Sequence, residues 1–415
     1  MKKMTIFTVI FILWNITTQA QDWQPKEHAV ICSSRTDGRF LSSYGVVHSL
    51  LTQTHPQLEY QENMSNKKFR KWQKKVNHAM KEIMNFPPQI QQPEAKCINK
   101  EEKEDYSLEK WEFYPLPNCV STFLVLKPNH ITQKTPAILC IPGSGQTKED
   151  LANEPGICPL ITTNQPNKRP MMALDFVKAG YIAVVVDNAA AGEASDLECY
   201  GKGRNFDYDI VSRILLELGW SWLGYTSYLD MQVLNWMKEQ PYIDRKRIII
   251  SGFSLGTEPM MVLGVLDKEI YAFIYNDFLC QTQERAISMT CPGMDGRRHF
   301  PNSIRHLIPN YWRYFNFPDI TASLAPRPII FTEGGLDRDF HKVQNAYKVA
   351  GHPDNIKYYH YPKFADKKKR HNIQQMPEGL DATEFFQLAN VDPTMHYFKS
   401  ELIIPWLKSV LEKEE

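Results

Sequence analysis

The sequence predicts an α/β fold, an open and mostly parallel sheet wound on both faces with helices. Several short runs of β-branched and apolar residues lack polar alternation, which is typical of strands covered on both faces. Helical patterns separate most of these runs. A third observation is the pentapeptide Gly-Phe-Ser-Leu-Gly at 252–256, which follows the apolar run Ile248 to Ile250 and precedes another, Met260 to Leu266. Strand, sharp turn and helix are the repeating unit of such folds.

Residues 1–20 have the features of a cleaved signal peptide. Lys2 and Lys3 form a charged start, an apolar stretch runs from Ile6 to Ile16, and Ala20 ends a small-residue cleavage site. The stretch is short for a membrane span, although a retained anchor is the alternative. We therefore expect an exported protein, periplasmic or secreted, with no membrane contact after signal removal.

Residues 21–104 differ from the rest of the chain and predict an N-terminal helical extension packed on the main domain. Apolar residues recur at helical spacing from Asn66 to Asn85, with lysines between them. Pro87, Pro88 and Pro93 then indicate a linker. The main domain is expected to cover residues 105–415.

Two strands joined by a turn open the main domain, at 111–114 and 121–126. The later strands are expected at 137–141, 182–186, 248–250, 273–275, 329–331 and 356–361. Within this domain, residues 281–318 suggest a lid. Its residues Arg297, Arg298, Tyr311, Trp312 and Tyr314 suit a sugar, although an ordinary packed insertion fits equally well.

Composition excludes several classes of function. The apolar fraction of 43% in 415 residues suits a large folded core, and a formal charge of +1 gives no basic surface for nucleic acid. The basic run at 367–370 is expected to be a solvated loop. The eight cysteines contain no Cys-x-x-Cys pair, so we expect no metal and no cofactor. Cys140 and Cys280 are expected to be buried apolar residues.

The pentapeptide at 252–256 predicts a nucleophile elbow with Ser254 as the nucleophile. A serine hydroxyl is a weak nucleophile at neutral pH, so it needs a base within reach and a third group to orient that base. In a sheet of this kind the three residues follow in the order serine, acid, histidine.

The preferred acid is Asp337, on the glycine turn after the strand at 329–331. Asp339, Asp277 and Glu333 remain alternatives. The preferred base is His396, on the last loop before a C-terminal amphipathic helix, with His371 as the alternative.

The oxyanion of a tetrahedral intermediate requires two donors. The backbone N–H of Leu255, which follows the nucleophile, is one candidate. The loop Pro-Gly-Ser-Gly-Gln at 142–146 offers the other, because glycines let a backbone approach the substrate closely. We favour the N–H of Ser144, with Gly145 as the alternative.

These motifs resemble the α/β-hydrolase superfamily, and most nearly its exported acetyl xylan esterase-like, dienelactone hydrolase-related group. The resemblance is carried by the segments 142–145, 187–192, 252–258 and 333–337 and by His396 before Pro405-Trp406-Leu407. It implies a metal-independent serine esterase acting on small esters or acetylated polysaccharides and oligosaccharides. A serine peptidase of the same fold and a non-catalytic binding protein are the alternatives. Many members of the superfamily carry a second glycine after Ser-x-Gly, where this chain has Thr257-Glu258-Pro259. Glu258 is expected to contact substrate or to favour the helix dipole.

Overall fold

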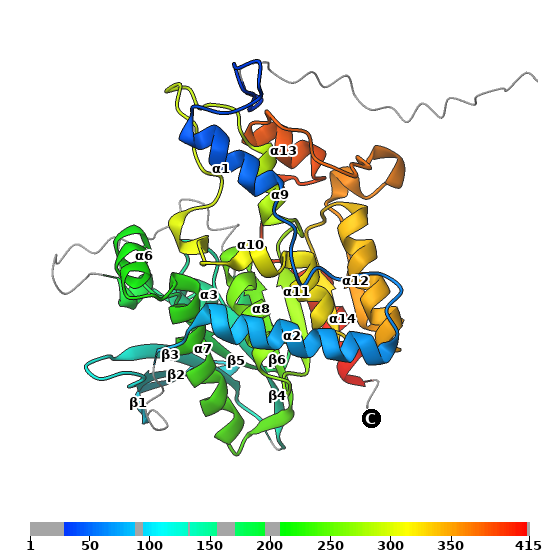
Figure 1. Ribbon diagram of the computed structural model, residues 1–415. Coiled ribbons are helices and arrows are strands. Elements are labelled where there is room, and N and C mark those ends of the chain that lie inside the picture. The colour runs from blue at the N-terminus through cyan, green and yellow to red at the C-terminus, as the bar shows by residue number, and fades with distance from the viewer. Residues whose placement is uncertain (1–28, 88–93, 132, 156–170, 196–207, 413–415) are drawn as a thin grey trace, which may run out of the picture.

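The computed structural model describes residues 29–87, 94–131, 133–155, 171–195 and 208–412. Its centre is a nine-stranded sheet in the order β1-β2-β3-β5-β4-β6-β7-β8-β9 (Figure 1). The strands are β1 (Ala95–Glu102), β2 (Tyr106–Phe113), β3 (Ser121–Pro128), β4 (Thr135–Ile141), β5 (Ile182–Val186), β6 (Ile243–Phe253), β7 (Ala272–Asn276), β8 (Ile329–Phe331) and β9 (Ile356–Tyr358).

The six strands from β5 to β9 in this order pair in parallel, whereas β1, β2 and β3 add an antiparallel edge. The prediction of a mostly parallel, doubly wound sheet is therefore confirmed. All eight strands expected from the sequence are present. Parallel neighbours place their carboxyl ends at one edge of the sheet, so loops that follow different strands meet there.

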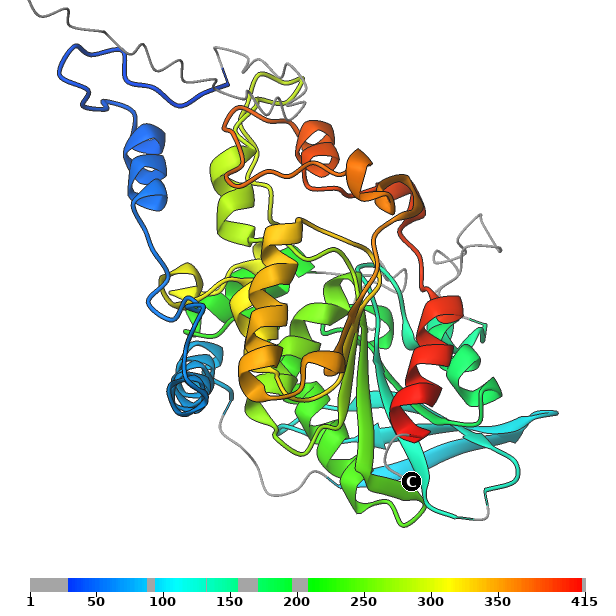
Figure 2. The same cartoon turned by 90° about the vertical axis from the view of Figure 1, so that its right-hand side faces the viewer.

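Helices cover both faces of the sheet, and the strands supply alternate residues to two cores. In β4, Ala137, Leu139 and Ile141 face the larger core, while Ile138 and Cys140 face the smaller one. Figure 2 shows α12 and α14 on opposite sides of the strands.

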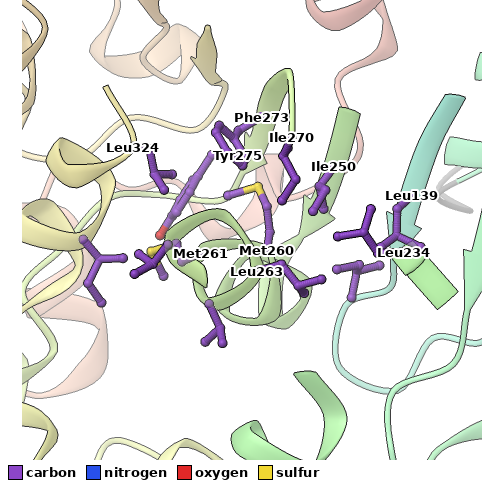
Figure 3. Packing of buried hydrophobic residues seen from close by; sticks show 14 of the residues in the cluster. Leu139, Leu234, Ile250, Met260, Met261, Leu263, Ile270, Phe273, Tyr275 and Leu324 are labelled. Carbon is purple, nitrogen blue, oxygen red and sulfur yellow. The ribbon is translucent and has the colours of Figure 1, made fainter. Parts of the chain in front are cut away.

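The larger core packs under α2 (Asn66–Met84), α7 (Trp222–Glu239), α8 (Thr257–Leu266), α11 (Phe317–Ser323) and α12 (Asp337–Ala350). The smaller core packs under α3 (Lys148–Ala152), α4 (Met172–Lys178) and α14 (Ser400–Glu412). Helix α8 lies at the centre of the larger core, where Met260, Met261 and Leu263 pack on β6, β7 and α7 (Figure 3). The helix that begins at the pentapeptide is therefore fixed by packing along its whole length.

The N-terminal segment contacts the main domain, and its described residues include a strand as well as helices. Helix α2 crosses the larger face, where Asn77 donates a hydrogen bond of 2.7 Å to the carbonyl of Val265. Strand β1 was not predicted from the sequence. Five of its eight residues are charged or are asparagine, and all but Ala95 are exposed, as suits an edge strand.

A group of short helices lies beyond the carboxyl ends of the parallel strands (Figures 1 and 2). They are α1 (Ser43–Thr52), α6 (Tyr208–Glu217), α9 (Thr282–Ser288), α10 (Tyr311–Tyr314) and α13 (Ala382–Leu388). Part of this group has its own small core, which includes Leu336, Phe364, Leu380 and Phe385. The described helices do not include one long and apolar enough to cross a bilayer. The predicted signal peptide, at residues 1–20, lies outside the described residues.

Candidate active site

Ser254 occupies a strained turn between β6 and α8. Its φ is +50°, in the left-handed region that non-glycine residues rarely adopt. The flanking glycines make this turn possible. A Cβ on Gly252 would lie 2.4 Å from the carbonyl oxygen of Gly256, and a Cβ on Gly256 would lie 2.3 Å from that of Ile141. The sequence therefore places Ser254 at the tip of a sharp elbow at the carboxyl edge of the sheet.

A cavity of about 800 Å³ opens over this edge. Ser254, Leu255, His396 and Ser144 all line it, so the structure brings these predicted residues together from three separate stretches of chain. Segment 281–318 forms much of the opposite wall, including Tyr311 and Trp312. Arg298 instead donates hydrogen bonds to backbone carbonyls of Thr290 and Ala29.

His396 lies between α14 and the short turn that ends at Met395. Its ring stacks on that of Phe253, with centroids 4.7 Å apart. Its Nδ1 lies 2.5 Å from Oε2 of Glu333, a carboxylate with no solvent exposure. Because Nδ1 is engaged, Nε2 is the nitrogen left to act as a base. The alternative base, His371, instead has its Nε2 3.2 Å from the amide of Gln387.

Glu333 is held by four donors. The amide of Asn276 and the ammonium of Lys399 donate to Oε1 at 3.0 and 2.8 Å. Tyr361 and His396 approach Oε2 at 2.8 and 2.5 Å. Burial tends to raise the pKa of Glu333, but the hydrogen bond and charge of His396 and the charge of Lys399 outweigh it and lower this pKa. Glu333 is therefore a fixed carboxylate.

The charges around His396 also set its protonation. Burial tends to lower the pKa of His396, but its hydrogen bond to Glu333 and the negative charges of Asp277 and Glu333 raise it above the ordinary value. Burial in turn raises the pKa of Asp277 to about 7, with the neighbouring Glu333 charge adding to the effect. The imidazolium form of His396 is thus stabilised by its surroundings.

The prediction that Asp337 pairs with His396 is wrong for this structure. Asp337 is the first residue of α12, and its carboxylate lies 2.5 Å from Nη1 of Arg370 and 3.3 Å from Nε2 of His360. Arg370 belongs to the basic run expected to be a solvated loop, and it is half-buried by this contact. Asp339 also points elsewhere and accepts a hydrogen bond from Gln281 at 2.8 Å.

The acid on His396 follows the strand that the sequence indicated, but it comes earlier in the turn. Glu333 stands two residues after β8, and the glycines at 334 and 335 follow with φ of +75° and +137°. The signal that could have found it is its position at the strand end, before the chain turns away. Glu333 was among the alternatives considered from the sequence.

Asp277, Glu333 and His396 also have the ligand types of a metal site, with ligand atoms within 4.8 Å of one another. The 2.5 Å contact between His396 and Glu333 is a hydrogen bond, and an ion between these atoms would replace it. The donors from Asn276, Tyr361 and Lys399 already satisfy the other positions of Glu333. The arrangement suits a charge-relay pair better than a cation site.

The loop at 142–146 follows β4 and begins beside the elbow, where a Cβ on Gly256 would lie 2.9 Å from the carbonyl oxygen of Pro142. In the described part of the chain, no acceptor engages the backbone N–H of Ser144, so it is available to an oxyanion. Gln146 braces the loop by accepting a hydrogen bond of 2.9 Å from the N–H of Gly143. Asn188 braces it from behind by donating 2.8 Å to the carbonyl of Pro142.

A buried charge cluster anchors the helix that follows this loop. The ammonium of Lys148 has no solvent exposure and contacts the carboxylates of Asp187, Glu193 and Glu149 at 2.6, 2.7 and 3.0 Å. The backbone N–H of Lys148 donates to Asp187 at 2.8 Å. These bonds tie the oxyanion loop to the end of β5.

Glu258 contacts a histidine of the opposite wall. Its carboxylate lies 2.5 Å from Nδ1 of His306, and both residues line the cavity. This contact connects the first turn of α8 to the segment 281–318. The expected substrate contact of Glu258 is compatible with its place in the cavity wall.

The chain was compared with protein-family profiles, with curated proteins and with solved structures. A sequence profile described as the abhydrolase family matches residues 22–409. A crystal structure from Bacteroides fragilis NCTC 9343, provisionally named an acetyl xylan esterase, is 64% identical with a TM-score of 0.89. The match covers 94% of this chain and all of that one. No curated protein matches the chain.

Two more distant structures share 16% and 12% identity. The first is a methylesterase, and the second is the glucuronoyl esterase of Solibacter usitatus. Each has a TM-score of 0.47. The matches cover 88% of this chain and 71% of the methylesterase, and 72% of this chain and 86% of the glucuronoyl esterase.

Proposed function

Since the chain belongs to the abhydrolase family, we propose that it is a serine carboxylic-ester hydrolase that removes small acyl groups from carbohydrate esters. One observation carries the proposal. Ser254 on its strained elbow and His396, whose Nδ1 is held by the buried Glu333, line the same cavity. A positioned serine, a histidine base and a buried carboxylate are the parts that acyl transfer requires.

The proposed reaction begins when Nε2 of His396 takes the proton of Ser254 as its Oγ attacks the ester carbonyl. Glu333 holds the ring through Nδ1 and stabilises the imidazolium that forms. The N–H groups of Leu255 and Ser144 donate hydrogen bonds to the oxyanion and so stabilise its charge. His396 then protonates the leaving alcohol. In the second half of the reaction, His396 takes a proton from water as the water attacks the acyl-enzyme, and it returns a proton to Ser254 as the acid leaves.

The choice of an acetylated polysaccharide or oligosaccharide as substrate draws support from the provisional name of the 64% identical relative. Export is part of the proposal, on the strength of residues 1–20 alone. N-terminal sequencing of the mature protein tests it. A mature chain that still carries Met1 would contradict cleavage.

A fluorophosphonate probe tests the nucleophile, because it labels only an activated serine. We expect one label, on Ser254, that is lost in Ser254→Ala. Ser251→Ala is a matched control three residues away on the buried strand β6. Absence of labelling on Ser254 would exclude the mechanism.

The substrate class needs a separate assay. Release of acetate from acetylated xylo-oligosaccharides and of 4-nitrophenol from its acetate should both depend on Ser254. Labelling of Ser254 together with cleavage of peptide amides and not of esters would identify a peptidase instead. Labelling without any turnover would indicate a binding protein.

A further inference from the structure

Arg305 brings a positive charge to the cavity beside the oxyanion loop. It lies in a short turn (Ile304–His306) of the segment 281–318, and its guanidinium lines the same cavity as Ser254. Nη2 donates a hydrogen bond of 3.0 Å to Oγ of Ser144. The guanidinium carbon lies 4.9 Å from the ring centroid of Tyr208. An aromatic face and a hydroxyl therefore fix its position.

No carboxylate neutralises this guanidinium among the residues that the structure describes. Its Nε is buried and has no hydrogen-bond partner. Glu258 is the acid that acts on it electrostatically, but the carboxylate of Glu258 is engaged by His306 at 2.5 Å. Burial also lowers the pKa of Arg305, which reflects incomplete solvation of the cation. A half-buried guanidinium without a counter-ion is a ready site for an anion.

The other acids of the site, Asp277 and Glu333, lie around His396 and form no ion pair with Arg305 in the described part of the chain. Lys399 balances Glu333 at 2.8 Å. Arg285, a second arginine of the cavity wall, packs over the rings of Phe385 and Phe386. Within the described ranges, Arg305 is thus a cavity cation that is held beside the reacting centre and has no carboxylate partner.

We infer that Arg305 and the hydroxyl of Ser144 form a subsite for a carboxylate carried by the substrate. This inference rests on the proposed function. A carboxylate accepts parallel hydrogen bonds from the guanidinium fork, and its single negative charge matches the single positive charge. Ser144 links the subsite to the reacting carbonyl, because its N–H is the candidate oxyanion donor and its Oγ contacts Arg305. The substrate class is therefore an ester with a carboxylate a few bonds from the reacting carbonyl, such as an acetylated uronic acid residue.

Two pairs of substrates locate the carboxylate. Mono-4-nitrophenyl glutarate and 4-nitrophenyl butyrate differ by a carboxylate in the acyl part. The methyl glycosides of 3-O-acetyl-glucuronate and 3-O-acetyl-xylose differ by a carboxylate in the alcohol part. For each pair, the charge preference is kcat/KM of the anionic ester divided by that of the neutral ester.

We expect Arg305→Gln to lower the charge preference by about 10- to 100-fold for at least one pair, as for loss of a hydrogen bond between charged groups. Arg305→Lys should restore part of it, since the charge returns without the fork. Arg313→Gln is the matched control, because it removes the same charge from an exposed arginine of the cavity rim. Its charge preference should equal that of the wild type.

Inhibition of the wild-type enzyme gives a measurement that needs no variant. Methyl glucuronoside should inhibit more strongly than methyl glucoside, and salt should weaken this difference. A charge preference in Arg305→Gln within twofold of wild type for both pairs, or equal inhibition by the two glycosides, would overturn the inference. Hydrolysis of the neutral esters in that case would leave the proposed function intact. Failure of the wild type to hydrolyse any of the four esters would instead overturn the proposed function.

Discussion

Replacing Glu333 by glutamine should disable the proposed reaction while leaving Ser254 and His396 in place. The variant removes the negative charge 2.5 Å from Nδ1 of His396. A hydrogen bond between charged groups is worth about 1.5–3 kcal/mol, which corresponds to about 10- to 150-fold in rate. The glutamine amide can also donate to Nδ1 and so favour the wrong tautomer of His396, which extends the loss toward about 10⁴-fold. We expect kcat/KM to fall by about 10²- to 10⁴-fold.

The pH dependence of the same variant has a definite sign. A base works only when neutral, and the surroundings of His396 raise its pKa above 6.5. The acid limb of the kcat/KM profile should therefore lie above pH 6.5 in the wild type. Removing the Glu333 charge should move this limb to lower pH, because imidazolium loses stabilisation.

The assay is hydrolysis of 4-nitrophenyl acetate from pH 5 to 9, with active sites counted by a fluorophosphonate. Counting is needed because Lys399, almost fully buried, loses its carboxylate partner in Glu333→Gln and the fold is weakened. Asp337→Asn is the matched control and should keep kcat/KM within about threefold of wild type. A large loss in Asp337→Asn together with an active Glu333→Gln would refute the assignment of the acid.

Two further predictions concern the supports of the site. Gly256→Ala should destabilise the protein by more than about 2 kcal/mol in urea unfolding, because its Cβ would overlap the carbonyl oxygen of Ile141. Gly351→Ala, at a φ of +90° with open space around it, should cost only the backbone strain of about 1–2 kcal/mol, and equal losses would contradict this reasoning. Lys148→Met should lower the free energy of unfolding by about 3–5 kcal/mol, because it leaves the buried carboxylates of Asp187 and Glu149 without their cation. An unchanged urea midpoint would show that the cluster contributes no net stability.

The sequence was informative wherever a residue's role follows from its neighbours along the chain. Buried strands such as Ile182–Val186 are continuous apolar runs, and the elbow requires glycines at fixed positions beside Ser254. Strand β1 could not be predicted in this way, because it is defined by its pairing with β2, while its own residues have the composition of a loop.

The sequence did not favour Glu333 over Asp337, because contacts between residues far apart in the chain decide which carboxylate reaches His396. Glu333 and Asp337 lie on the same turn, and both are carboxylates at the correct edge of the sheet. What separates them is Arg370, which approaches Asp337 from 33 residues further along the chain. The position of Arg305 against Ser144, 161 residues apart in sequence, is likewise set by tertiary packing.

The pairing of Glu333 with Lys399 changes the electrostatics of the proposed proton transfer. Lys399 offsets part of the field of Glu333 at His396, because its ammonium lies 2.8 Å from the carboxylate. When His396 takes a proton, the three groups together would hold an uncompensated positive charge. Asp277 is a second carboxylate close to His396; its negative charge favours the imidazolium, while burial raises the pKa of Asp277 to about 7. The proposed reaction would therefore draw on two carboxylates: Glu333 aligns the imidazole, and Asp277 offsets part of the charge that forms on it.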